Sequence, residues 1–250
     1  MKLQKIKLPK QYQYVEGQSR PEYKKFDGWQ KISYSQFTSF KDYKMGYLQD
    51  YILKVGNGES GIFANFGSDC GDYLNPKDNR EYELLSENDI SILEPIKQNH
   101  PKNSDFEYEI LISLEPFGLE KVCVQAFTDR QYLENNLLNI NDYKTLTVKT
   151  KKSYYESDEY KQLSVYGYGL EELGFTIGEM WVDGLGRSGN NTIKGDKNVL
   201  RLSGEIIKID KPYDREKAKE VLQSIVSICI DISEYFSVFN SFFGEKVVSL

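Results

Sequence analysis

The segment Ile140-Asn141-Asp142-Tyr143-Lys144-Thr145 places an acid two residues before a lysine, and a second acid, Asp129, lies upstream. On a β-strand this spacing points the acid and the lysine to the same face. Twelve residues separate Asp129 from Asp142, which is enough for two adjacent strands and a connection. Acids on neighbouring strands can share one metal ion, so this layout is typical of a metal-dependent phosphodiesterase.

The residue types in this pattern suit phosphodiester hydrolysis with Mg²⁺ or Mn²⁺. These ions favour carboxylates, carbonyls and water, which Asp129, Asp142 and the Tyr143 backbone carbonyl would supply. Lys144 would hold or polarise the attacking water and offset phosphate charge. Taken alone, however, an Asp-x-Lys tripeptide is common by chance, and a surface strand with alternating charge looks the same.

Composition predicts an intracellular, cytoplasmic protein that does not enter a membrane. The 250 residues contain no apolar run of membrane-helix length, and the basic N-terminus lacks the apolar stretch of a signal peptide. The three cysteines lie far apart, which favours buried thiols over disulfides or a zinc site. The single histidine, His100, argues against a histidine-based catalytic triad. The net charge of −6 does not favour a nucleic-acid binder, but a local basic cluster does: Lys144, Lys149, Lys151 and Lys152.

Hydrophobic patterning predicts a single α/β domain over residues 1–250, with helices flanking a central mixed sheet. We expect an irregular extension over residues 1–31 and a flexible loop over residues 184–198. The expected helices cover about 35–52, capped by Ser35, then 66–74, 87–96, capped by Ser86, 157–173 and 214–239. The expected strands cover 106–114, 121–129, 140–148, 175–182 and 200–209, with 130–139 as a connection.

With these elements in order, the chain resembles the PD-(D/E)XK nuclease superfamily, in its RecB-type branch, which includes CRISPR-associated RecB-like exonucleases. The resemblance starts from Asp129 and the segment 140–145, and continues with Gln162 and Tyr166, which match a Q-x-x-x-Y motif. Residues 32–37 and 66–71 are similar to the starts of the two helices that precede the catalytic strands in that branch. The resemblance covers about residues 32–173 and implies a restriction-endonuclease-like core.

The resemblance implies a role for each matched residue. Asp129 and Asp142 would be metal ligands, and Lys144 would be the catalytic lysine. Gln162 and Tyr166 would orient the active site or contact the DNA backbone, although Tyr166 also fits a core position. Tyr154 and Tyr155 would either stack on the bases of a single strand or cap the edge of the sheet.

The chain departs from the family pattern at three places. Gly71 stands where RecB-type members often carry a metal-binding histidine, and Asp69, Asp72 or Glu109 could replace that ligand. Ala126 stands where the family usually has glycine. Tyr43 occupies the place of the first iron–sulfur cysteine, so no iron–sulfur cluster is expected.

The resemblance predicts a stand-alone nuclease of phage or mobile-element type, located in a bacterial cytoplasm or an infected host cell. It would be an exonuclease on single- or double-stranded DNA ends, acting in recombination, replication or DNA degradation. Some relatives form rings or act beside a single-strand annealing partner, and the sequence reports neither. Two alternatives stay open: an inactive nuclease-fold protein that binds DNA or a protein partner, and a site-specific endonuclease.

Overall fold

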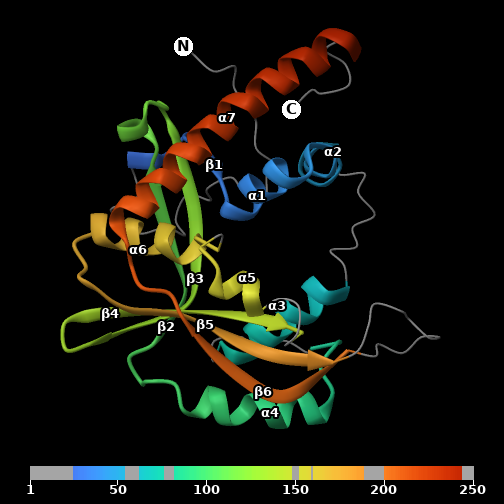
Figure 1. The fold of residues 1–250 in the computed structure, drawn as a ribbon, viewed down its shortest axis with the longest axis vertical. Helices are drawn as coiled ribbons and strands as arrows, with labels where there is room; N and C mark the ends of the chain where they lie inside the picture. Colours follow the sequence, from blue (N-terminus) through green and yellow to red (C-terminus); the bar gives the residue numbers. More distant parts are fainter. Residues whose placement is uncertain are drawn as a thin grey trace. The chain divides into compact units, whose positions relative to one another are not determined.

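The computed structural model describes residues 25–53, 62–75, 82–147, 152–158, 160–188 and 200–243. They form an α/β fold in which helices flank a mixed six-stranded sheet, as predicted (Figure 1). The strand order is β1 (Gln30–Ile32), β3 (Val122–Glu134), β4 (Leu137–Leu146), β5 (Ile177–Ser188) and β6 (Arg201–Asp210), and β2 (Asp105–Ser113) pairs with β3. None of the helices in the described part of the chain is both long and apolar enough to cross a membrane.

Contacts between Cα atoms group the chain into two compact units. The first comprises Met1–Gly58, Glu109–Phe127 and Glu216–Leu250, and the second comprises Glu59–Tyr108 and Thr128–Arg215. Strands β2 (Asp105–Ser113) and β3 (Val122–Glu134) contribute residues to both units. The single domain expected from the sequence therefore stays a prediction, and each unit is described by itself.

The first unit holds a short strand that the sequence pattern did not reveal. Strand β1 (Gln30–Ile32) pairs in parallel with β3, and Gln30 lies opposite Val122. The expectation of an irregular chain through residue 31 is therefore wrong at its end, and residues 1–24 lie outside the described residues. The other elements of this unit are α1 (Tyr34–Asp42), α2 (Lys44–Tyr47), a π-helical turn (Leu48–Leu53), a 3₁₀ turn (Glu115–Phe117) and most of α7 (Arg215–Phe243).

Helix α1 begins two residues earlier than predicted. Ser33, not Ser35, is its N-cap, because Gln36 completes a capping box with Ser33. The Gln36 backbone N–H donates to the Ser33 hydroxyl at 3.1 Å, and the Gln36 side chain accepts from the Ser33 N–H at 2.8 Å. The expected single helix to residue 52 is interrupted at Tyr43, where the backbone is extended (φ −154°, ψ 87°).

The second unit contains most of the sheet. Its strands are β4 (Leu137–Leu146), β5 (Ile177–Ser188), β6 (Arg201–Asp210) and the later part of β3. Its helices are α3 (Ile62–Leu74), α4 (Glu87–Gln98), α5 (Lys152–Glu156) and α6 (Gln162–Glu172). Strand β4 is antiparallel to β3 and parallel to β5, and β5 is antiparallel to β6. Ser86 caps α4, as predicted.

Residues 130–139, expected to be a connection, form a β-hairpin. Strand β3 continues to Glu134, which pairs with Leu137 at the start of β4. Asn135 and Asn136 make the two-residue turn with φ of 50° and 64°. Both values lie in the left-handed region, which asparagine adopts more readily than most residues and which a type I′ hairpin turn requires.

Two further predicted boundaries are wrong. The expected helix over 157–173 begins later, at Gln162, where α6 starts. A separate short helix, α5, ends at Glu156, and the Ser157 hydroxyl that follows it donates to the Tyr154 carbonyl. The expected loop from residue 184 is strand as far as Ser188. Gly184 and Gly186 are there because neighbouring groups approach closely: a Cβ on Gly186 would lie 2.9 Å from the Glu205 carbonyl oxygen. Residues 189–198 of that loop lie outside the described residues.

The two faces of the sheet in the second unit carry different contents. A buried cluster joins α3 and α4 to Tyr143 and Leu185 on one face: Phe66, Cys70, Leu74, Leu93, Tyr143, Leu185, Leu200 and Leu202. Successive strand residues point to opposite faces, so Asp142 and Lys144 point away from this cluster. Helix α6 packs against β4 and β5, and Figure 1 shows α4 and α6 on opposite sides of these strands.

Candidate functional site

Asp142 and Lys144 form a close pair on β4. The Lys144 Nζ lies 2.6 Å from Asp142 Oδ2, as expected for two residues on one strand face. The Asp142 side chain is almost fully buried, whereas the Lys144 side chain is 27% exposed. Although burial alone would lower it, the charges of Asp142 and Asp129 raise the pKa of Lys144, so the lysine carries its positive charge.

Asp129 joins this pair from β3. Its Oδ2 accepts the backbone N–H of Tyr143 at 2.7 Å, which fixes the carboxyl group beside β4. Desolvation and the neighbouring charge of Asp142 raise the pKa of Asp129 to about 7, while Lys144 and the Tyr143 N–H act in the opposite direction. The structure therefore brings together the two acids and the lysine that the sequence selected.

Tyr160 is a member of this site that the sequence analysis missed. Its hydroxyl lies 2.8 Å from Asp142 Oδ2 and 3.1 Å from Gln162 Oε1. Tyr160 is buried, and burial raises the pKa of its hydroxyl, so it stays a neutral donor. The sequence placed Tyr160 inside a helix, whereas it precedes α6 and its side chain reaches β4. We call Asp129, Asp142, Lys144 and Tyr160 the carboxylate centre.

Gln162 and Tyr166 lie next to the carboxylate centre, one turn apart on α6. The Gln162 amide donates to the Tyr166 hydroxyl, and Gln162 contacts Tyr160 on its other side. Tyr166 is 4% exposed. Because Tyr166 is buried, we infer that it packs against the carboxylate centre and orients it. A residue that contacts DNA would be more exposed.

A cavity of about 600 Å³ opens beside the carboxylate centre. It is lined by residues of α3 from Phe63 to Asp72, by Asn75 just after that helix, and by Asp129, Lys144, Tyr155 and Arg187. Arg187 and Tyr155 both belong to the second unit, as do all the lining residues. Sequence patterns did not indicate Arg187, because Gly184 and Gly186, which precede it, made this part of β5 look like a loop.

The residue that would replace the family's histidine ligand stays open, but the three candidates differ in position. Asp72 lines the cavity, as does Gly71, where a Cβ would meet no atom within 4 Å. Asp69 is engaged elsewhere, accepting the Leu84 N–H at 3.1 Å. Glu109 belongs to the first unit, where it lies 3.6 Å from Lys31 and accepts from Gln125 at 2.7 Å.

The contacts of the carboxylate oxygens indicate whether a divalent cation would fit this centre. Asp142 Oδ1 is buried and accepts no hydrogen bond from the described residues. Burial, and after it the neighbouring charge of Asp142, raises the pKa of Asp129, and a cation between the two carboxylates would offset both causes. Both features fit a bound Mg²⁺ or Mn²⁺, held by Asp129, Asp142 and the Tyr143 carbonyl. Within the described ranges, however, no three His, Cys, Asp or Glu side chains cluster as a metal site.

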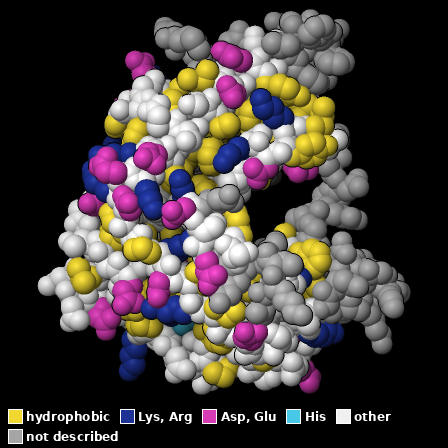
Figure 2. Space-filling view, viewed as in Figure 1, with side chains coloured by type: hydrophobic (Ala, Val, Ile, Leu, Met, Phe, Trp, Pro, Cys, Tyr) yellow, Lys and Arg dark blue, Asp and Glu magenta, His cyan; other side chains and the backbone are white. Residues whose placement is uncertain are grey.

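Only some of the basic and aromatic residues predicted to lie near the site are among the residues that the structure describes. Lys149 and Lys151 lie outside the described residues. Tyr155 is buried, with its ring centre 4.9 Å from that of Tyr160, and Tyr154 is 40% exposed. On the face drawn in Figure 2, acidic and basic side chains of the described residues are interspersed and the basic ones form no continuous patch.

No protein-family model matches the sequence, and neither does any curated protein. Among solved structures, the chain is similar to the crystal structure of SSO0001, with 13% sequence identity and a TM-score of 0.42. The match covers 79% of this chain and 76% of that one. A likeness at this level supports no conclusion about function.

Proposed function

We propose that this chain is a metal-dependent DNA nuclease that hydrolyses phosphodiester bonds, acting as an exonuclease on DNA ends. The observation that carries the proposal is the convergence of Asp129, Asp142 and Lys144 beside one cavity. The resemblance of these residues, with Gln162 and Tyr166, to the RecB-type PD-(D/E)XK nucleases supports the same activity. Recombination, replication or DNA degradation in a phage or mobile element is the setting that this resemblance favours.

Each residue of the centre has a chemical task in this proposal. When bound, Mg²⁺ or Mn²⁺ supplies Lewis-acid stabilisation of the charge that develops on the phosphoryl oxygens. Lys144 carries a fixed positive charge at the cavity wall, where it offsets phosphate charge and orients the attacking water. Tyr160 holds the Asp142 carboxylate in one orientation by its hydrogen bond to Oδ2.

A catalytically inactive protein that binds DNA or a protein partner is the second candidate. The observation that favours it is that, among the described residues, two acids and no third lie in the centre, with Gly71 where the resemblance leads one to expect a third ligand. This alternative predicts binding without cleavage under any divalent ion.

The test is cleavage of end-labelled single- and double-stranded linear DNA by the purified full chain, with Mg²⁺, with Mn²⁺ and with EDTA. We expect cleavage with the metals only, and a loss of about 10³-fold in Lys144→Met, since electrostatic groups at a reacting centre are worth that much. Lys208→Met is the matched control, because Lys208 is an exposed lysine paired with Glu179 and Asp210 on the surface. Its activity should stay within about twofold of the wild type.

The outcomes separate the candidates. Unchanged cleavage by Lys144→Met, or cleavage in EDTA, would contradict the proposed centre. DNA binding with no cleavage in either metal would favour the inactive binding protein. A covalently closed circular DNA tests the alternative of a site-specific endonuclease, because an endonuclease cuts it and an exonuclease does not.

A further inference from the structure

Arg187 is a buried arginine whose charge has no acidic partner among the described residues. It is 9% exposed, and its Nε and Nη1 atoms donate to none of the described residues. No ion pair joins it to a described acid, and burial lowers the pKa of its guanidinium. Arginine keeps its charge in proteins nevertheless. A buried charge of this kind is costly unless something pairs with it.

Phe63 holds the guanidinium from one side. The guanidinium carbon lies 4.0 Å from the centre of the Phe63 ring, close enough for a cation–π contact. Two of the guanidinium nitrogens, Nε and Nη1, are buried and donate to none of the described residues. A planar cation with unused donors on its edge suits the oxygens of a phosphate group.

The other arginines near this sheet have different surroundings, although Arg130 is also buried and its Nε likewise donates to none of the described residues. Arg215 pairs with Glu171 and Glu172, and Arg201 donates to the Leu200 carbonyl. Arg130 lies among the rings of Tyr132, Tyr143 and Trp181, away from the cavity wall. Arg187 differs from these three because it lines the cavity that Asp129 and Lys144 also line.

The place of Arg187 in the sheet separates it from the carboxylate centre. Lys144 on β4 lies opposite Gly184 on β5, and Arg187 follows three residues later. Three residues along a strand span roughly 10 Å. The charges of Asp129 and Asp142 act on Lys144 but are not among the causes that shift the pKa of Arg187. A phosphate on Arg187 would therefore be a different one from the phosphate at the centre.

We propose that Arg187, supported by Phe63, is a phosphate-binding residue that holds a second phosphate of the nucleic-acid strand lying in the cavity. The identity of the strand rests on the proposed function, whereas the binding of a phosphate group does not. Arg187 thereby positions the strand and sets how tightly it binds, while the carboxylate centre acts on the neighbouring linkage.

The test measures binding in EDTA, so that neither metal nor cleavage contributes. Inorganic phosphate is titrated by calorimetry, and a fluorescein-labelled single-stranded oligonucleotide by anisotropy at fixed ionic strength. Arg187→Met removes the charge but keeps an apolar chain against Phe63, and Arg187→Lys keeps the charge without the planar edge. Arg201→Met is the matched control, since Arg201 is exposed on β6 and pairs with Ser188, the neighbour of Arg187.

We expect Arg187→Met to weaken the binding of both probes at least about tenfold, with Arg187→Lys in between and Arg201→Met within about twofold of the wild type. In the cleavage assay, Arg187→Met should raise KM about tenfold and leave kcat nearly unchanged. A melting curve for each variant checks that it is folded. Loss of phosphate binding in a folded Arg201→Met to the same extent would overturn the proposal.

The two proposals fail in different ways. If the wild type cleaves no DNA but Arg187→Met still loses binding of both probes, the phosphate site stands and the nuclease proposal fails. If the wild type cleaves DNA and Arg187→Met binds both probes normally, the phosphate site fails and the nuclease stands. Binding of inorganic phosphate without the oligonucleotide would overturn the assignment to a nucleic-acid strand, and binding of neither probe would overturn the site altogether.

Discussion

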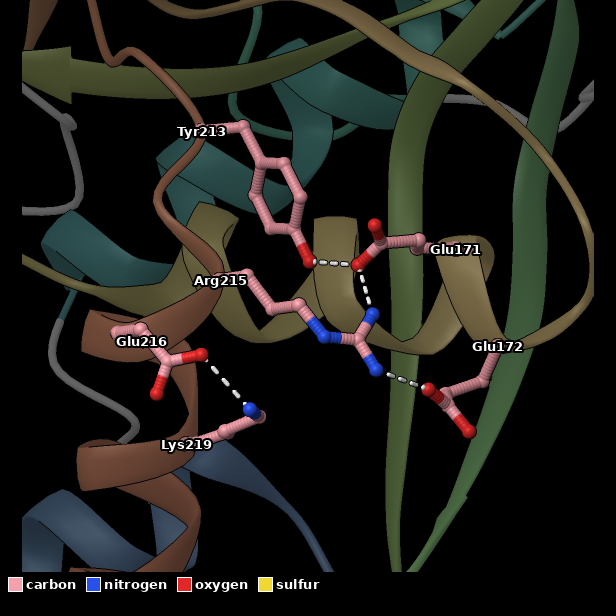
Figure 3. A network of polar contacts seen from close by, with 6 residues as sticks. All are labelled: Glu171, Glu172, Tyr213, Arg215, Glu216 and Lys219. Atoms are coloured by element: carbon pink, nitrogen blue, oxygen red, sulfur yellow. Dashed lines mark hydrogen bonds and ion pairs between the residues drawn. The ribbon is translucent and has the colours of Figure 1, made fainter.

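Two polar networks in the second unit contain the same kinds of residue but differ in their access to water. Each joins a tyrosine, two acids and one cation. These residues are Tyr160, Asp142, Asp129 and Lys144 in the carboxylate centre, and Tyr213, Glu171, Glu172 and Arg215 in a second set, which we call the surface network (Figure 3). In both, the tyrosine hydroxyl donates to a carboxylate that also contacts the cation.

Access to water is what distinguishes the two networks. In the surface network, Arg215 contacts both acids and the side chains are 34% to 52% exposed, so solvent screens the remaining charge. In the carboxylate centre, Asp142 is buried and Asp129 has its pKa raised to about 7. Each network has two acids and one cation, so each has one more negative than positive group. Solvent screens this excess in the surface network, whereas the excess is uncompensated in the buried carboxylate centre. An uncompensated buried charge is what a cation-binding site requires.

The largest difference between the networks should appear in catalysis. Replacing Asp142 with Asn keeps the shape of the side chain but removes a charge from the centre, and we expect cleavage to fall by about 10³-fold. Replacing Glu171 with Gln makes the same change in the surface network and should alter the rate by no more than about twofold. Initial rates of cleavage of a labelled linear duplex in Mn²⁺ provide the measurement. Equal losses in the two variants would show that the comparison has no functional meaning.

The burial of the opposite face of β4 from the carboxylate centre can be measured at His100, the only histidine in the chain. Its Nε2 lies 2.9 Å from the Tyr143 hydroxyl, and burial, with the charges of Arg130 and Lys97, lowers its pKa to about 4. A proton NMR titration of the ring should show this value in place of the ordinary 6.5. A pKa near 6.5 would mean that water reaches the His100 ring beside Tyr143.

The same shift predicts how stability depends on pH. Between about pH 6.5 and pH 4 the unfolded chain binds a proton at His100 that the folded chain does not. The free energy of unfolding should therefore fall as the pH falls through this window. His100→Gln, which cannot titrate, should show a shallower slope in urea denaturation at pH 4.5, 5.5 and 6.5.

A smaller effect is expected from the two tyrosines. Tyr160→Phe removes the donor that orients Asp142, and we expect the rate of DNA cleavage to fall about tenfold, as for the loss of one hydrogen bond to a charged group. Tyr213→Phe removes the equivalent donor to Glu171 and should leave the rate unchanged. The ratio of kcat between the two variants is the quantity to compare. A ratio near one would assign Tyr160 a packing role only.

The smallest effect should come from the cation of the surface network. Arg215→Met breaks exposed ion pairs, so the melting temperature should change by no more than about 3 °C, and by less in 1 M salt. Thermal unfolding at low and high salt measures this. A larger change that salt does not reduce would show that the network is more than a screened surface contact.

Local sequence patterns predicted most of the elements but not the contacts that end them. The Asp-x-Lys spacing correctly brought Asp142 and Lys144 together, because strand geometry alone determines which side chains share a face. The hairpin at Asn135-Asn136 was missed, although two adjacent asparagines are a signal for a turn with positive φ. Ser33 was passed over for Ser35, although Gln36 stands three residues after Ser33, as a capping box requires.

The missed parts of the candidate site depend on tertiary contacts. Tyr160 joins the centre because the chain between α5 and α6 turns its ring toward β4, and no periodic pattern encodes that turn. Arg187 lies in a strand whose glycines made it look like a loop, and only the approach of Glu205 and Leu146 explains those glycines. Residues that meet through space in this way leave no regular spacing in the sequence.

The binding of Mn²⁺ to the purified chain in the absence of DNA tests the central claim most directly. Isothermal titration calorimetry on the wild type, Asp142→Asn and Glu171→Gln compares one acid from each network. We predict that the wild type and Glu171→Gln bind Mn²⁺ equally and that Asp142→Asn binds it at least about tenfold more weakly. Equal affinity in all three proteins, or no binding to the wild type, would contradict the account.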